Sequence, residues 1–342
     1  MRQVQEIADE LVASGAERGL QVAAYVDGEQ VVDVVAGVAD PATGRPVTPD
    51  TLFYNWSIGK AATATLVHRL GLDVETRVVE VWPEFGKHGK DVVTVRQVLD
   101  HTAGVPGLPA GVTVDDVCSW PTMTAALEDA QPWWEPGTKV GYHAYTFGYL
   151  AGEIVRRVTG RALGDALADL TADLGYPDEI RYGMSDPTGL AVLEDAPSDL
   201  DWSQMPAEML AAAPLTVLPN AALGADPRVP AADIPAGAKV TARALAALYA
   251  QWLTSPRLAE VAAVSAAGDD QVYGNPCRMS LGFALGMPFD EHAPRAFGWA
   301  GAGGSWAGAD PDRGVAVAVT KNVMGMDFTA VERLVGAVLA DV

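Results

Sequence analysis

Two neighbouring segments near the start of the chain are rich in β-branched and other apolar residues, and together they run from Leu20 to Asp40. The dipeptide Asp27-Gly28 separates them, which is typical of a tight turn, so the pattern predicts a β-hairpin. Residues 1–19 have apolar side chains at helical spacing and predict an amphipathic helix before the hairpin.

The end of the chain shows β-strand character again. Apolar runs over 279–287, 296–309 and 313–322 predict strands, and the turn residues 310–314 separate the last two. A helical pattern over 332–342 closes the chain. Strands at both ends of the chain predict one sheet that the two termini build together.

The middle of the chain, from about Gly71 to Asp201, is mostly helical in pattern. Segments 94–104, 145–160 and 163–174 have helical spacing of apolar residues, and a further helix is expected after the capping residue Thr241. Proline and aspartate are frequent over 197–235, which we interpret as a long loop region that shapes a binding site.

The expected fold class is therefore α/β (α+β). An antiparallel sheet flanked by helices would comprise residues 1–70 and 236–342, and a mostly helical lobe with substrate-shaping loops would comprise 71–235. The active site is expected between the two parts.

Composition narrows the functional classes. The 342 residues are 49% hydrophobic and carry a formal net charge of −21, which favours a globular core and disfavours nucleic-acid or anionic-membrane partners. No apolar run is long enough for a transmembrane helix, and the acidic N-terminal segment is unlike a secretion signal, so we expect a cytoplasmic protein. Its two cysteines and five histidines have no metal-site spacing, so we expect no metal and no cofactor; oligomeric state stays open.

Ser57 and Lys60 are the first candidates for chemistry. Residues three apart at the start of a helix face the same side. A serine hydroxyl is a weak nucleophile until a base removes its proton, and a lysine amine can do so once burial lowers its pKa. The motif Ser-x-x-Lys is weak evidence alone, because without further support the serine is an ordinary helix cap and the lysine an exposed helix residue.

Two later segments fit the same chemistry. Tyr142 follows a Pro-Gly turn and precedes a helix, and a phenol beside an ammonium can transfer a proton. In the segment 297–311, glycines at 301, 303 and 304 within an expected strand would let a ligand approach the backbone, whose N–H groups can bind an oxyanion.

Three motifs in this order resemble those of the serine β-lactamase and penicillin-binding protein superfamily: Ser57-x-x-Lys60, Tyr142-His143-Ala144 and Trp299-Ala300-Gly301. The segment Val98-LDHTAGVPGL also resembles one of that family, and the likeness covers about 20–325. Within the superfamily, the chain most resembles the class C-like branch, and especially its family VIII carboxylesterases.

The resemblance implies roles for the motif residues. Ser57 would be the acylated nucleophile, Lys60 its base, and Tyr142 the group that protonates the leaving group and later activates water. The backbone N–H groups of Ser57 and Ala302 would form the oxyanion hole. Residues expected to contact the substrate are Trp299, Gly301, His143 and Ala144.

Two departures from the family pattern favour esters over β-lactams. Ala144 stands where the lactamases usually have an asparagine, and Trp299 where they usually have lysine or histidine. The replacement by Trp299 removes a charge-assisted hydrogen bond to the carboxylate of a β-lactam, which is worth about 1.5–3 kcal/mol. The indole offers an apolar wall and one donor instead.

The sequence therefore predicts a serine hydrolase that cleaves carboxylic esters through an acyl-serine intermediate, with a small-molecule ester or acyl compound as its partner. The alternative is an acyltransferase that passes the acyl group to an alcohol or amine. A β-lactamase and a non-catalytic binding relative are weaker alternatives.

Several conspicuous residues are expected to be structural. Trp134 and Trp306 are interpreted as packing residues, and His101 as the brace of a loop. The segment around Ser305 nearly matches the Gly-x-Ser-x-Gly elbow of α/β-hydrolases, but the final glycine and a later histidine are missing.

Overall fold

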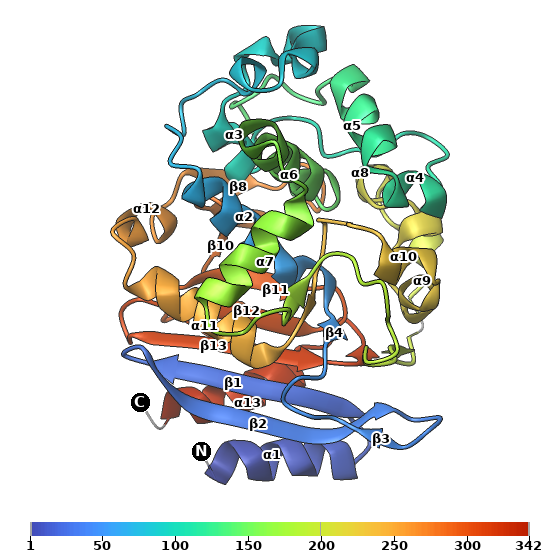
Figure 1. Cartoon of the computed structure of the whole chain (residues 1–342), viewed down its shortest axis with the longest axis vertical. Coiled ribbons are helices and arrows are strands. Elements are labelled where there is room, and N and C mark those ends of the chain that lie inside the picture. Colours follow the sequence, from blue (N-terminus) through green and yellow to red (C-terminus); the bar gives the residue numbers. More distant parts are fainter. Residues whose placement is uncertain (1, 199, 341–342) are drawn as a thin grey trace.

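A nine-stranded antiparallel sheet joins the two ends of the chain in the computed structural model, which describes residues 2–198 and 200–340 (Figure 1). The strand order is β3-β2-β1-β13-β12-β11-β10-β9-β8. The strands are β1 (Gly19–Val26), β2 (Glu29–Asp40), β3 (Arg45–Pro46), β8 (Ala266–Asp269), β9 (Pro276–Met279), β10 (Ala284–Leu285), β11 (Phe297–Gly301), β12 (Ser305–Asp310) and β13 (Val315–Lys321).

Pairing between β1 and β13 unites the terminal segments, with Val22 opposite Val319. The hairpin predicted at Asp27-Gly28 joins β1 to β2. The mixed fold with a large antiparallel sheet confirms the predicted fold class.

The two faces of the sheet carry side chains of different size. Along β13, Val315, Val317 and Val319 face the helices α1 (Arg2–Ala13) and α13 (Thr329–Ala340) in one core. Ala316 and Ala318 face the opposite side, where α11 (Ala242–Leu253) packs. Successive strand residues point to opposite faces, so this alternation lets α11 lie close to the strands.

The remaining helices gather beyond α11 and away from the termini in Figure 1. They are α2 (Lys60–Arg69), α3 (Val95–Leu99), α4 (Val114–Cys118), α5 (Trp120–Asp129), α6 (Thr146–Thr159), α7 (Leu163–Asp173), α8 (Ala207–Ala212), α9 (Ala221–Ala225), α10 (Arg228–Ala231) and α12 (Leu258–Val261). Short strands pair beside them: β4 (Phe53–Tyr54) and β5 (Ile180–Arg181) with β7 (Lys239–Val240), and β6 (Glu194–Asp195) with β14 (Val323–Met324). The division of the chain at 70/71 and 235/236 stays a prediction.

Several predicted elements differ from the observed ones. Segment 197–235 is not simply a loop, because it contains α8, α9, α10 and two short 3-10 turns at Trp202–Gln204 and Leu215–Val217. The expected helix over 94–104 is only the short α3, and α13 begins earlier than expected. Of the expected strand 279–287, only Met279 and Ala284–Leu285 lie in strands, and residues 280–283 form a loop between β9 and β10.

Gly303 and Gly304 correct a further expectation. They do not lie within a strand but form the turn between β11 and β12, with φ of 106° and 79°. This left-handed backbone is readily adopted only by glycine. No helix in the described ranges 2–198 and 200–340 is long and apolar enough to cross a membrane.

A buried ion pair ties the N-terminal segment to the sheet. Lys321 Nζ lies 2.7 Å from Glu17 Oε1, and both side chains are only 4% exposed. Burial raises the pKa of Glu17, although the neighbouring Lys321 ammonium acts in the opposite direction. Removing one partner of such a pair leaves an uncompensated charge in the interior.

We therefore expect Glu17→Ala to lower the free energy of unfolding by roughly 3–5 kcal/mol. The matched control is Glu6→Ala, which breaks the exposed pair between Arg2 and Glu6 and should cost at most about 1 kcal/mol. Urea unfolding followed by circular dichroism measures both. A loss for Glu17→Ala as small as the control's would contradict the importance of the buried pair.

Candidate active site

Ser57 lies on a tight 3-10 turn, Trp56–Gly59, that leads directly into α2. The preceding residue, Trp56, has a φ of 51°, a conformation that is uncommon for a residue other than glycine. Such a backbone is retained only where the surroundings enforce it. Here the Trp56 ring stacks on Tyr54 with centroids 4.1 Å apart, and Trp56 is 2% exposed.

Backbone contacts on the other side hold the same turn. A Cβ on Gly237 would lie 2.6 Å from the Trp56 Cα, and one on Gly59 would lie 2.4 Å from the Ala238 N. The Ala238 N–H donates to the Trp56 carbonyl at 3.3 Å. The segment 236–238 therefore packs directly on the serine turn, and glycine is required at both positions.

Asn55 anchors this turn to the sheet. Its Nδ2 donates to the Lys321 carbonyl at 2.8 Å, and the Lys321 N–H donates to Asn55 Oδ1 at 3.2 Å. The amide therefore pairs with the backbone of β13 in the way a neighbouring strand would. Sequence reasoning missed Asn55; its position two residues before the serine was the available signal.

Lys60 is fully buried and its amine touches the serine. Nζ lies 2.9 Å from Ser57 Oγ and 2.9 Å from the Ala236 carbonyl oxygen. Burial lowers the pKa of Lys60 to about 7, because a desolvated ammonium loses its hydration. A substantial neutral fraction therefore exists near pH 7, and a neutral amine can accept the hydroxyl proton. The contact with the Ala236 carbonyl could not be predicted from the sequence, because every residue has a backbone carbonyl.

Tyr142 approaches the same hydroxyl from the segment before α6. Lys60 Nζ lies 5.1 Å from the centroid of its ring. Burial raises the pKa of Tyr142. A hydrogen bond with Ser57 acts in the opposite direction, but its effect is smaller. The phenol is therefore protonated at neutral pH and can donate a proton. The structure thus brings Ser57, Lys60 and Tyr142 together.

Asp270 fixes the backbone at Tyr142. Its Oδ2 accepts from the Tyr142 N–H at 3.0 Å, and its Oδ1 accepts from the N–H groups of Val272 and Tyr273 at 2.8 and 3.0 Å. This carboxylate connects the loop after β8 to the tyrosine. Its sequence position gave no indication of this contact.

His101 and His143 brace the tyrosine segment. The His143 N–H donates to His101 Nδ1 at 3.0 Å, and the Gly141 N–H donates to the His101 carbonyl at 3.1 Å. His143 Nε2 accepts from the Val105 N–H at 3.1 Å, so its ring proton is on Nδ1, which donates to the Gly141 carbonyl at 2.6 Å. Burial lowers the pKa of His143 to about 4 and that of His101 well below its ordinary value, so both rings are neutral.

This network corrects one expectation. His143 was predicted to contact the substrate, but it is 1% exposed and both ring nitrogens bind backbone groups. The structure does not support it as a substrate-binding residue. Ala144 is partly exposed two residues after Tyr142, and Trp134 and Trp306 are buried at 7% and 1%, as expected for packing residues.

Gly301 brings β11 against the serine turn. A Cβ on Gly301 would lie 2.3 Å from the Asn55 carbonyl oxygen and 2.3 Å from Ser305 Oγ. Ala302 follows in the turn before β12 and is partly exposed. β11 and the residue that leads into the serine turn therefore approach so closely that only glycine fits at 301.

Trp299 lines the same region but offers no free donor. It is 3% exposed, its ring centroid lies 5.7 Å from that of Tyr142, and its Nε1 donates to the Gly282 carbonyl at 3.0 Å. The expectation of a donor for the substrate is therefore wrong, because the backbone already uses it. The indole contributes an apolar wall beside the tyrosine.

Comparison with known proteins agrees with this geometry. The sequence matches the family model named Beta-lactamase over residues 4–340. An esterase/beta-lactamase, LipL, from Mycobacterium tuberculosis is 33% identical over 343 residues, which cover 89% of this chain and 77% of the relative.

Two solved structures are similar over nearly their whole length. A penicillin-binding protein homologue from Caulobacter crescentus has a TM-score of 0.88 and 33% identity, covering 100% of this chain and 97% of the other. A family VIII carboxylesterase has a TM-score of 0.92 and 29% identity, with the same coverages. The chain therefore belongs to the serine β-lactamase and penicillin-binding protein superfamily and is a serine hydrolase of that superfamily.

We expect Gly301→Ala to reduce kcat/KM for an activated ester by about 10²-fold, because the added methyl would push β11 or the serine turn out of place and small displacements of reacting groups are costly. Gly336→Ala in α13 is the control, since a Cβ there meets nothing within 4 Å. Steady-state kinetics with p-nitrophenyl acetate measures both. Equal activity of the two variants would refute the close approach.

Proposed function

We propose that the protein hydrolyses carboxylic esters through an acyl-Ser57 intermediate. The observation that carries the proposal is the buried Lys60 amine 2.9 Å from Ser57 Oγ, with its pKa lowered to about 7. Membership of the superfamily and the similarity to proteins named as esterases support it.

In the proposed acylation step, Ser57 Oγ attacks the ester carbonyl carbon while its proton passes to Lys60 Nζ. The backbone N–H groups of Ser57 and Ala302 stabilise the developing oxyanion. When the bond to the alcohol oxygen breaks, Tyr142 donates its proton to that oxygen. The tyrosinate then recovers a proton from the Lys60 ammonium, which leaves an acyl-serine and a neutral amine.

Deacylation reverses these proton transfers, with water in place of the alcohol. The neutral Lys60 amine takes the proton of Tyr142, and the resulting tyrosinate accepts a proton from water as the water oxygen attacks the acyl carbon. The Lys60 ammonium then gives its proton to the serine oxygen as the bond between that oxygen and the acyl carbon breaks. The raised pKa of Tyr142 favours the phenol as the donor, because its proton is retained at neutral pH until an alkoxide forms.

The preference for esters rests on the groups around the site. Trp299 presents an apolar ring whose N–H is already bonded, and Ala144 has no side-chain amide. Neither replaces the hydrogen bonds that the corresponding superfamily residues would give to a β-lactam carboxylate and amide. A substrate without a carboxylate avoids that loss.

The direct test is covalent labelling. Incubation with p-nitrophenyl acetate should give a burst of p-nitrophenol and an acetyl mass increment that maps to Ser57. Ser57→Ala should lose both the burst and turnover, and the exposed Ser203→Ala should keep both. Unchanged turnover in Ser57→Ala would exclude the proposed nucleophile.

The pH dependence tests the base. Only neutral Lys60 can accept a proton, so kcat/KM should rise with pH through about 7 and then level off. Lys60→Met should lose about 10²–10⁴-fold in kcat/KM, whereas Lys139→Met, at an exposed position, should retain the wild-type profile. A rate that rises only near the ordinary lysine pKa would count against the buried base.

A second candidate is β-lactam hydrolysis, which the name of the Mycobacterium tuberculosis relative favours. It would use the same acyl-serine chemistry. Turnover of a chromogenic cephalosporin comparable to that of p-nitrophenyl acetate would favour this function and count against the proposed effect of Trp299. Transfer of the acyl group to an added alcohol, detected as a new ester, would instead indicate an acyltransferase.

A further inference from the structure

His101 occupies a backbone position that usually takes glycine. The helix α3 ends at Leu99, and His101 follows two residues later with a φ of 62°. The Thr102 N–H donates to the Gln97 carbonyl at 2.9 Å, which completes a common helix-ending motif whose left-handed residue is usually glycine. A β-carbon in this conformation strains the backbone, so the imidazole has to make contacts that offset the strain.

Backbone strain of this kind is buried at only two places in the described ranges. Three of the five non-glycine residues with positive φ are exposed, whereas Trp56 and His101 are at most 2% exposed. Trp56 directly precedes Ser57, and His101 contacts the residues on both sides of Tyr142. Strained residues cluster at functional sites, where the surrounding structure enforces them. The strain at His101 therefore points to the tyrosine.

His101 is bonded to the backbone on both sides of Tyr142. Its carbonyl accepts from the Gly141 N–H at 3.1 Å, and its Nδ1 accepts from the His143 N–H at 3.0 Å. The Tyr142 N–H is held separately by Asp270. Three successive backbone N–H groups, at 141, 142 and 143, therefore have fixed partners.

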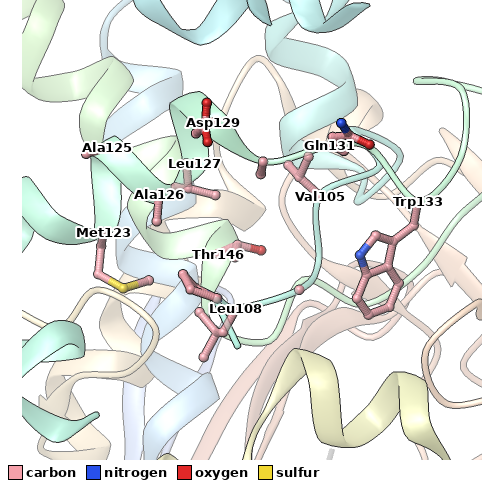
Figure 2. A pocket seen from close by; sticks show the side chains of 13 residues that line it. Val105, Leu108, Met123, Ala125, Ala126, Leu127, Asp129, Gln131, Trp133 and Thr146 are labelled. Carbon is pink, nitrogen blue, oxygen red and sulfur yellow. The ribbon is translucent and has the colours of Figure 1, made fainter. Parts of the chain in front are cut away.

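The loop that follows His101 extends this support to the start of α6. The Val105 N–H donates to His143 Nε2 at 3.1 Å. Val105 and Thr146, the first residue of α6, both lie on the wall of the cavity in Figure 2. His143 is therefore held from the His101 side and from the loop, and Tyr142 is bonded covalently to this support.

The imidazole also packs against the phenol ring. Its centroid lies 5.3 Å from that of Tyr142, 4.8 Å from that of Phe147 and 5.4 Å from that of Trp299. His101 is fully buried, and the Tyr142 and Trp299 centroids are 5.7 Å apart. Because protein interiors are close-packed, the phenol cannot move toward the imidazole without displacing it.

The hydrogen bond from His143 fixes which imidazole nitrogen of His101 carries the proton. Nδ1 accepts an N–H, so the neutral ring is protonated at Nε2, for which residues 2–198 and 200–340 offer no hydrogen-bond partner. Burial holds the pKa of His101 well below its ordinary value, and His143 and Lys60 act in the same direction. A charged ring would carry a proton on Nδ1 and would lose the bond from His143. The support therefore requires a neutral imidazole.

We propose that His101 is a positioning residue for proton donation by Tyr142, which it fixes beside Ser57 through its ring and through its bonds to Gly141 and His143. Within the described residues, no hydrogen bond joins His101 to Ser57 or Lys60, so it acts through the tyrosine. The inference rests on the proposed esterase function and deepens it, because it names a residue on which protonation of the leaving alcohol depends.

The kinetic consequence depends on the leaving group. An alkoxide is a strong base and leaves only when Tyr142 supplies a proton, whereas p-nitrophenolate is a weak base and leaves without one. Deacylation needs the phenol for every ester, because the proposed mechanism activates water through it. A displaced Tyr142 should therefore slow acylation by alkyl esters and deacylation after any ester, but leave acylation by p-nitrophenyl acetate nearly unchanged.

The test compares ethyl acetate with p-nitrophenyl acetate in the wild type and in His101→Gly, which lacks the ring and the Nδ1 acceptor. For ethyl acetate, kcat/KM should fall by about 10–10²-fold, a part of the 10²–10⁴-fold that a general acid supplies. For p-nitrophenyl acetate, kcat and KM should fall together by about tenfold, so that kcat/KM stays within about threefold and the burst remains. Tyr142→Phe should give the same pattern with larger losses.

Two further variants separate positioning from a general effect on the fold. His101→Asn tolerates the left-handed backbone and keeps an oxygen that can accept the His143 N–H, so it should show the same pattern with smaller losses. His88→Gly is the matched control, because His88 has a φ of 57° at an exposed position, and it should keep the wild-type kinetics. Equal losses in kcat/KM for the two esters, or unchanged kinetics, in His101→Gly would overturn the proposal. If His101→Gly does not fold, the same outcomes in His101→Asn decide.

Nuclear magnetic resonance separates this inference from the esterase function. With ¹⁵N-labelled histidine, His101 should be unprotonated at Nδ1 and protonated at Nε2 at pH 7. With ¹³C-labelled tyrosine, the Tyr142 ring signal should broaden or divide in His101→Gly and stay sharp in His88→Gly. These spectra without any ester turnover would refute the proposed function but retain the support of Tyr142 by His101. A proton on Nδ1, or an unchanged Tyr142 signal in His101→Gly, would overturn the inference even if esters are cleaved.

Discussion

The burial of one amine governs the chemistry of this protein. Lys60 has no exposed surface, and its Nζ is hydrogen-bonded to the Ser57 hydroxyl and to the Ala236 backbone carbonyl, neither of which is charged. A carboxylate in their place would hold the amine in its charged form, whereas desolvation lowers its pKa to about 7. The fraction of Lys60 that is neutral, and so able to accept a proton near pH 7, therefore depends on the exclusion of water and anions from its Nζ.

The sheet and the helices keep that amine buried from several sides. Asn55 ties the serine turn to β13, Gly301 lets β11 close over it, and the segment containing Ala236 covers the amine. Two glycines, at 59 and 237, allow backbone segments to approach within contact distance. Each of these contacts joins residues that are far apart in the sequence, so the site exists only in the assembled fold.

Much of this arrangement was predictable. The hairpin at Asp27-Gly28, the sheet built from both termini and the helices after Tyr145 and Thr241 follow from periodicity and turn chemistry, and the structure confirms them. The resemblance to the serine β-lactamase and penicillin-binding protein superfamily is confirmed as well. Short helices within 197–235 were missed, because segments of four to six residues carry too few apolar positions to establish a period.

The sequence by itself determined which groups are available for chemistry: a serine, a lysine three residues later and a tyrosine in the order of one superfamily. Only the tertiary structure decided their burial, their protonation and their hydrogen-bond partners. The distant Val105 N–H and the neighbouring Gly141 carbonyl bind the two ring nitrogens of His143, and the Gly282 carbonyl accepts the indole N–H of Trp299. Thr146 Oγ1 has no hydrogen-bond partner within the described residues. Hydrogen-bond partners and burial arise between segments that the sequence separates, so local pattern cannot give them.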